Sequence, residues 1–173
     1  MKNLLVLGAS SAISQAYINR VADRCEKIVL VARDATKLRD VALHVGTISE
    51  AVVTSIEADL ADVSKHEELV SAIAGTLGTI DCVLISYGQL TDQKRCLDEP
   101  QYALDQFNLN GTSTVSLCVH LARYMTQQAS GTLAVIGSVA GDRGRMSNYC
   151  YGAAKSAVAV SYTHLTLPTI YSV

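Results

Sequence analysis

The sequence is poor in the features that mark several classes of protein. Its 173 residues include no tryptophan, one phenylalanine and two prolines, and charged residues make up 17% of the chain. The formal net charge of −2 comes without a basic stretch that would neutralise the phosphates of a nucleic acid. No apolar run approaches the roughly 20 residues of a membrane-spanning helix, and the start of the chain shows no signal-peptide core. We therefore expect a cytoplasmic protein that binds no nucleic acid and has no integral membrane segment.

The cysteines and histidines form no ligand pattern. The five cysteines are widely separated and include no Cys-x-x-Cys pair, and the four histidines show no spacing typical of metal ligands. We expect reduced, buried thiols and no metal site.

Apolar segments alternate with amphipathic ones along the chain, a pattern typical of strands and crossover helices in a parallel sheet. The expected strands cover 3–7, 28–31, 52–56, 82–85 and 133–136, and the expected helices cover 12–25, 34–44, 63–77 and 100–128, the last interrupted only at Gly111. With 49% hydrophobic residues, one domain can bury a core. The sequence predicts an α/β fold, a doubly wound parallel sheet of the Rossmann type, over residues 1–159. Such folds bind ligands at the carboxyl ends of their strands.

The turn after the first expected strand is built from small residues. They allow the backbone to approach a pyrophosphate, which then lies at the positive end of the following helix. Only the first glycine of a glycine-rich fingerprint is present, because alanine and serine stand at positions 12 and 14. An ordinary strand-to-helix turn is the alternative. The candidate cofactor contacts are Gly8, Ser10, Ser11, Ala12 and Ile13.

Arg33 follows the second expected strand, at the position that discriminates between dinucleotides. An acidic residue there binds the ribose 2′-hydroxyl of NAD, whereas a basic one accommodates the 2′-phosphate of NADP. The guanidinium of Arg33 suits a phosphate, and the neighbouring Asp34 suits the cap of the next helix. The sequence predicts NADPH as the cofactor, the alternative being that Arg33 is a solvated surface charge.

Tyr151 and Lys155 are four residues apart, so on a helix they share one face. A phenol beside an ammonium gives up its proton more readily, which is what a ketone needs when a hydride reaches its carbon. Tyr149 has no such partner, because Ala153 stands four residues after it. The spacing by itself is common, and other motifs must support it.

Further motifs follow at the ends of the other strands, in a fixed order. They are Asp59 and Leu60 after the third strand, Gly88 after the fourth, Asn110 in the long helix and Ser138 after the fifth. Together with Gly8 and the Tyr-x-x-x-Lys pair, these residues resemble the motifs of the short-chain dehydrogenase/reductase family, from Met1 to about Val158.

This resemblance implies a role for each matched residue. Tyr151 would be the general acid, Lys155 would assist it and bind the nicotinamide ribose, and Ser138 would hold the carbonyl of a small-molecule substrate. Gly88 and Tyr151 would also contact the cofactor. Asn110 would anchor a water that relays protons to Lys155, and Asp59 and Leu60 would contact the adenine ring. Simpler explanations remain open: Asn110 beside Gly111 as a helix kink, with Asn108 as a second candidate, and Ser138 as a turn residue.

The sequence departs from the family after the fourth strand, where the usual Asn-Ala-Gly reads Ser86-Tyr87-Gly88. Tyr87 would place a phenol beside the cofactor. Residues 137–149 are similar to the decaprenylphosphoryl-2-keto-pentose reductase branch, which implies a keto-sugar on a lipid or nucleotide carrier. Arg143 and Arg145 would then contact a substrate phosphate, the alternative being a solvated loop.

Other functions use the same motifs. A 3-oxoacyl-carrier-protein reductase or a broad carbonyl reductase would share the catalytic groups, and a non-catalytic nucleotide-binding protein would share the fold. The resemblance also implies a homo-oligomer.

The pattern changes from about Val160, where VSYTHLTLPT replaces the helical periodicity with β-branched residues and a proline. These ten residues back-translate to a transposon-type adapter used in short-read DNA sequencing. We expect residues 160–173 to be a non-native tail on a C-terminally truncated domain, which would end the last helix after Val158, expose the edge of the strand over 133–136 and leave an inactive fragment. The alternative is a real and unusual tail.

Overall fold

A computed structural model describes residues 1–163 and 170–172. Six parallel strands form one sheet in the order β3-β2-β1-β4-β5-β6. The strands are β1 (Asn3–Leu7), β2 (Lys27–Ala32), β3 (Val52–Glu57), β4 (Cys82–Ile85), β5 (Thr132–Val135) and β6 (Ile170–Ser172). The predicted α/β fold is confirmed, and each of the five expected strands lies within one residue of its expected bounds.

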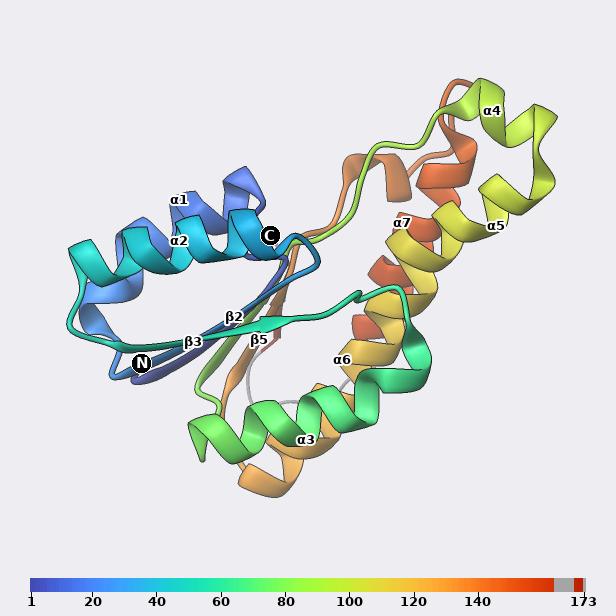
Figure 1. Cartoon of the computed structure of the whole chain (residues 1–173). Coiled ribbons are helices and arrows are strands. Elements are labelled where there is room, and N and C mark those ends of the chain that lie inside the picture. Colours follow the sequence, from blue (N-terminus) through green and yellow to red (C-terminus); the bar gives the residue numbers. More distant parts are fainter. Residues whose placement is uncertain (164–169, 173) are drawn as a thin grey trace.

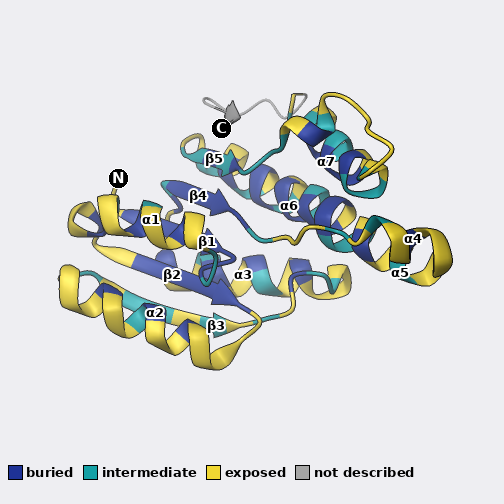
Figure 2. Cartoon of the chain, turned by 90° about the horizontal axis from the view of Figure 1, so that it is seen from above, coloured by how far each residue is buried: buried dark blue, intermediate teal, exposed yellow. Residues whose placement is uncertain are grey.

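Helices cover both faces of the sheet (Figure 1). One face carries α1 (Ala12–Val21) and α2 (Ala35–Ile48), and the other carries α3 (His66–Leu77) and α6 (Ser113–Gln128). Alternate residues of the central strands divide between the two cores: Leu4 and Val6 pack toward α1 and α2, and Leu5 and Leu7 pack toward α3 and α6. Figure 2 shows β1, β4 and most of β2 buried, whereas the edge strand β3 and the outer faces of the helices are more exposed. Parallel strands covered on both faces are expected to be continuously apolar, and β1 is apolar from Leu4 to Leu7.

The order of the strands places a crevice between β1 and β4. From β1 the chain winds outward to β2 and β3, then returns to the other side of β1 with β4 and β5. At this change of direction the helices after β1 and β4 lie on opposite faces, so the carboxyl ends of the two strands are left uncovered. Gly8 and Tyr87 therefore meet at this point of the sheet.

The long helix expected over 100–128 is divided. It consists of α5 (Pro100–Phe107), a π-helical turn (Asn108–Thr112) and α6. At this turn Gly111 lies against α7 (Tyr149–Tyr162), where an added Cβ atom would be 3.2 Å from the Cα of Ala154. A short helix that the periodicity did not predict, α4 (Gln93–Asp98), precedes α5, and the side chain of Asp92 caps it by accepting the N–H of Arg95.

The expectation for the edge of the sheet is wrong. β6 pairs in parallel with β5, with Leu133 opposite Ile170, so β5 is not an edge strand. The last helix is also longer than expected, since α7 continues past Val158 to Tyr162. The adapter interpretation of 160–173 stays a prediction, and residues 164–169 and 173 of that segment lie outside the described residues.

Candidate active site

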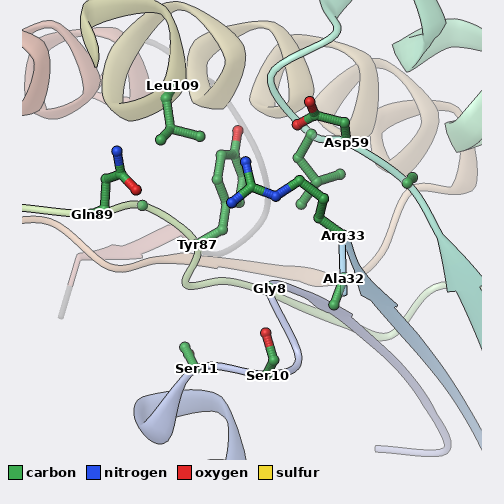
Figure 3. Close-up of a pocket in the computed structure, with 12 residues that line it drawn as sticks. Gly8, Ser10, Ser11, Ala32, Arg33, Asp59, Tyr87, Gln89 and Leu109 are labelled. Carbon is green, nitrogen blue, oxygen red and sulfur yellow. The ribbon is translucent and has the colours of Figure 1, made fainter. Parts of the chain in front are cut away.

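A pocket of about 220 Å³ lies at the carboxyl ends of the strands (Figure 3). Most of the predicted cofactor contacts line it, and the exceptions on the first turn of α1, Ala12 and Ile13, are exposed to solvent. Their N–H groups are among the first four of the helix, which have no acceptor inside it. The lining residues are Gly8, Ser10, Ser11, Ala32, Arg33, Ala58, Asp59, Leu60, Tyr87, Gly88, Gln89 and Leu109.

Gly8 makes the close approach between the ends of β1 and β4 possible. Its φ is 94°, and an added Cβ atom would lie 2.6 Å from the backbone nitrogen of Tyr87. Any other residue would combine backbone strain with a steric clash. Gly8 therefore fixes the floor of the pocket where β1 becomes α1.

Two serines that depart from the family pattern, Ser14 and Ser86, are hydrogen-bonded to each other. Ser14, where the fingerprint has glycine, and Ser86, where the family has asparagine, share a hydrogen bond between their hydroxyl groups. The Ser86 hydroxyl also pairs with that of Ser11 (3.1 Å), and the Ser11 hydroxyl accepts the N–H of Ser14 (3.1 Å) as the N-cap of α1. The three serines hold the turn after β1 against the end of β4.

Tyr87 lines the pocket, but its hydroxyl is directed to α6. It pairs with the hydroxyl of Ser113 (2.9 Å) and accepts a hydrogen bond from that of Thr114 (3.2 Å). Burial raises the pKa of Tyr87 to about 12, so the phenol stays neutral. The phenol expected beside the cofactor is thus a fixed neutral wall of the pocket.

Arg33 is exposed and its guanidinium extends over the pocket in Figure 3. None of the ion pairs between described residues includes it. The neighbouring Asp34 accepts the N–H of Lys37 (3.0 Å) and caps α2, as predicted. Arg33 is therefore available to an anion in the pocket.

Asp59 and Leu60 form the wall opposite the turn after β1. The Asp59 carboxylate accepts the N–H of Ala61 (3.0 Å), and Leu60 is buried. Sequence reasoning missed His66, whose Nε2 bonds to the carbonyl oxygen of Leu60 (3.1 Å). The sequence feature that could have identified it is a histidine at the start of α3, where the neighbouring residues are apolar or acidic.

Lys155 is buried, with 5% of its surface exposed, on the face of α7 that points to the sheet. Its Nζ donates to the carbonyl oxygen of Ile136 (3.1 Å) and lies 5.9 Å from the centroid of the Tyr151 ring. Burial lowers the pKa of Lys155. The two residues of the predicted pair therefore share one face at the end of β5.

Asn110 is completely buried beside this pair. Its Oδ1 accepts the N–H of Gln89 (2.9 Å), and its Nδ2 donates to the carbonyl oxygen of Gln106 (3.1 Å). A Cβ atom on Gly88 would lie 2.8 Å from this Oδ1 and 3.9 Å from Nζ of Lys155. Gly88 therefore lies between the pocket and Lys155. The asparagine next to both Gly88 and Lys155 is Asn110, not Asn108.

Ser138 begins the short turn that packs on α7. Its hydroxyl oxygen accepts the N–H of Ala140 (3.2 Å), which leaves the hydroxyl hydrogen for another acceptor. The packing is tight, since an added Cβ on Gly152 would lie 2.7 Å from the Ala140 carbonyl oxygen and one on Gly141 would lie 2.8 Å from the Lys155 carbonyl carbon. This contact holds the turn that begins at Ser138 against the part of α7 that carries Tyr151.

Two kinds of site are absent from the part of the chain that the structure describes. No group of three or more His, Cys, Asp or Glu side chains is arranged to hold a metal ion. No helix within the described residues combines the length and apolar character needed to span a bilayer.

Comparisons with known proteins agree with this geometry. Over residues 2–169 the chain matches the family model for short chain dehydrogenases. It is 32% identical over 155 residues to an uncharacterised oxidoreductase of Mycobacterium tuberculosis, covering 90% of this chain and 62% of the relative. It is 28% identical to carbonyl reductase family member 4 of Xenopus laevis, covering 88% of this chain and 63% of the relative. The chain thus spans less than two thirds of the length of these relatives.

Solved structures show the same architecture. Levodione reductase matches with a TM-score of 0.84 at 24% identity, over 95% of this chain and 67% of that chain. A short-chain dehydrogenase from Sphingobium yanoikuyae in complex with NADPH matches with a TM-score of 0.83 at 27% identity, over 95% of this chain and 64% of that chain. By its sequence match and its fold, the chain belongs to the short chain dehydrogenase family.

Proposed function

We propose that this protein reduces a ketone with NADPH. The observation that carries the proposal is the connection at Gly88 between the pocket and the buried Lys155, with Tyr151 on the same helix. The pocket fits a dinucleotide because Gly8 and Gly88 allow the ends of β1 and β4 to pack closely at its floor, where a Cβ atom would clash with Tyr87 or Asn110. Arg33 also lies over the pocket and takes part in none of the ion pairs between described residues. When bound, NADPH supplies a hydride to the carbonyl carbon of the substrate.

Each residue of the site has a task in this proposal. Ser138 donates its hydroxyl hydrogen to the carbonyl oxygen and orients it. Tyr151 donates the proton to that oxygen, and the ammonium of Lys155 makes its release easier. Asn110 holds the segment after β4 against Lys155 and anchors the water through which the lysine exchanges protons. The burial of the lysine strengthens these interactions.

Steady-state kinetics with NADPH and NADH test the cofactor. We expect the wild-type protein to prefer NADPH, and Arg33→Ala to raise the KM for NADPH about tenfold, because a charge-assisted bond to the 2′-phosphate is lost. The KM for NADH should change less than about twofold, since NADH has no such phosphate. Arg39→Ala, which removes an exposed arginine from α2, is the control and should change neither value. A clear preference of the wild-type protein for NADH would contradict the proposal.

Arg143 and Arg145 support a phosphorylated keto-sugar on a lipid or nucleotide carrier as the substrate. Both are exposed, and no ion pair recorded between described residues includes either one. Val139 and Met146, in the same segment, are 82% and 92% exposed. The segment after Ser138 thus combines cations for a phosphate with apolar side chains for a lipid carrier.

A double variant tests this substrate. We expect Arg143→Ala with Arg145→Ala to lower kcat/KM for a phosphorylated keto-sugar by roughly 10-fold to 100-fold, because each lost phosphate contact costs about 1.4 kcal/mol. An uncharged ketone serves as the control and should react as before. Equal activity of variant and wild type on the phosphorylated substrate would contradict the assignment.

A second candidate is a broad carbonyl reductase or a 3-oxoacyl-carrier-protein reductase. The resemblance to a carbonyl reductase of Xenopus laevis favours it, and the catalytic groups are the same. A panel of simple ketones, acyl thioesters and phosphorylated keto-sugars separates these substrates. Binding of NADPH without turnover on any of them would instead indicate a non-catalytic nucleotide-binding protein or an inactive fragment. Assembly into a homo-oligomer stays a prediction.

A further inference from the structure

His66 is a buried titratable side chain outside the proposed chemistry. Only 1% of its surface is exposed. Its Nε2 lies 3.1 Å from the carbonyl oxygen of Leu60, and its Nδ1 lies 2.9 Å from the hydroxyl of Ser116 on α6. A carbonyl oxygen only accepts, so Nε2 carries the proton and Nδ1 accepts from the serine. Burial lowers the pKa of His66, which keeps the ring in this neutral form.

A second side chain holds the next carbonyl group of the same loop. Nδ2 of Asn108, in the π-helical turn, donates to the carbonyl oxygen of Ala61 (2.8 Å). The last sheet bond before the loop is that from the Ala58 N–H to the carbonyl of Ala32 (3.1 Å). Beyond that bond, His66 and Asn108 connect the loop to α3 and to the long helix. The position of the loop thus depends on side chains outside it.

The loop has two sides with different contacts. Asp59 and Leu60 line the pocket of Figure 3, whereas His66 lies outside it and lines an adjoining cavity that shares Asp59 and Arg33 with the pocket. His66 instead contacts the carbonyl group of Leu60 from behind, with Ser116 as its support. A change at His66 therefore reaches a ligand in the pocket of Figure 3 by moving this wall.

We propose that His66 is a positioning residue for cofactor binding: its bond to the Leu60 carbonyl holds Asp59 and Leu60 against the adenine half of the dinucleotide. This assignment rests on the proposed function. Asn108 holds the same wall from the other helix, so the two side chains act on one loop. Gly88 and Lys155 would hold the nicotinamide half, and the hydrogen bonds of His66 go instead to Leu60 and Ser116.

Binding of 2′,5′-ADP, which carries the adenine half of NADPH alone, is the direct test. His66→Leu leaves the Leu60 carbonyl without its donor, and we expect the Kd of 2′,5′-ADP to rise about tenfold. His66→Gln keeps an N–H donor at similar reach and should restore most of the affinity. In turnover with NADPH, the KM should rise while kcat changes less than about twofold, because the acid and its lysine are untouched.

Gln128→Leu is the matched control. Gln128 also bonds to a backbone segment, the N–H and carbonyl of Ile80, but far from the pocket. It should lower stability without changing the Kd of 2′,5′-ADP, which separates positioning from a general loss of stability. If His66→Leu does not fold, Asn108→Ala takes its place with an expected loss of several-fold.

The outcomes are distinct. A folded His66→Leu variant with wild-type affinity for 2′,5′-ADP, a Gln variant no better than the Leu variant, or an Asn108→Ala variant without effect would overturn the assignment. Wild-type protein that binds neither NADPH, NADH nor their adenine-bearing fragments would overturn the proposed function itself, and the assignment with it.

Discussion

Tyr151→Phe is expected to lower kcat for ketone reduction by a factor of about 10² to 10⁴, the usual contribution of a positioned general acid. The variant loses only the hydroxyl group that donates the proton. No hydrogen bond recorded between described residues uses this hydroxyl, so the free energy of unfolding should change by less than about 0.5 kcal/mol. NADPH binding should stay within about twofold of the wild-type value, because the pocket does not include Tyr151. Steady-state kinetics, NADPH titration and denaturant unfolding measure the three quantities.

Tyr149→Phe is the control for this prediction. Tyr149 lies on the same first turn of α7 but is 43% exposed, and Ala153 stands where a lysine partner would be. Removing its hydroxyl should leave kcat unchanged. A Tyr151→Phe variant that keeps more than about a tenth of the wild-type kcat would show that another group supplies the proton.

The central strands β1 and β4 were predictable because their environment is uniform. β1 and β4 match their expected bounds, and every residue in both strands is buried. A run of apolar residues is the direct consequence of covering a parallel strand on both faces. The local sequence alone therefore contains the information that fixes these elements.

The interruption of the long helix depends on contacts between distant segments. Residues 108–112 keep a helical pattern, and the π-helical turn there coincides with the close packing of Gly111 on Ala154 of α7. The short α4 was missed for a different reason: it carries no apolar periodicity, although its cap at Asp92 is a local bond to the N–H of Arg95. Only the π-helical turn depends on a contact that cannot be read from one segment.

The candidate site also contains residues that the sequence predicts and residues that it does not. Gly8, Asp59, Gly88 and Ser138 were found because strand ends of a parallel sheet meet at one edge. The bond between Ser14 and Ser86 was not predictable, because each serine by itself appears only as the loss of a family residue, a glycine at position 14 and an asparagine at position 86. Their bond exists only because β1 and β4 are neighbours, and the same holds for His66, whose partners lie on a loop and on α6.

Lys155→Met should remove activity while stabilising the fold. The ammonium of Lys155 is buried, its recorded partner is the neutral carbonyl of Ile136, and none of the ion pairs between described residues involves it. Burying a charge without a counter-ion costs free energy, which the methionine avoids. We expect kcat to fall by at least about 10² and the free energy of unfolding to rise by about 1 kcal/mol near neutral pH.

The pH dependence of unfolding separates this charge effect from simple repacking. Because burial lowers the pKa of Lys155, the folded protein releases the proton at lower pH than the unfolded chain. Between the two values the unfolded state binds more protons, so the stability contributed at this site rises with pH. The advantage of Lys155→Met over the wild type should therefore be largest below the folded pKa and shrink toward about pH 10.

Lys155→Arg completes the comparison, since it keeps the charge but replaces a compact ammonium with a larger guanidinium that does not release its proton. We expect it to lose activity without the gain in stability that methionine gives. Denaturant unfolding of the three proteins at neutral and alkaline pH provides the measurement. A methionine variant that is destabilised equally at both pH values would mean that the bond to the Ile136 carbonyl outweighs the buried charge. The gain in stability that we expect would mean that Lys155 serves the chemistry of the site and lowers the stability of the fold. Such a trade-off between stability and activity is common at functional sites.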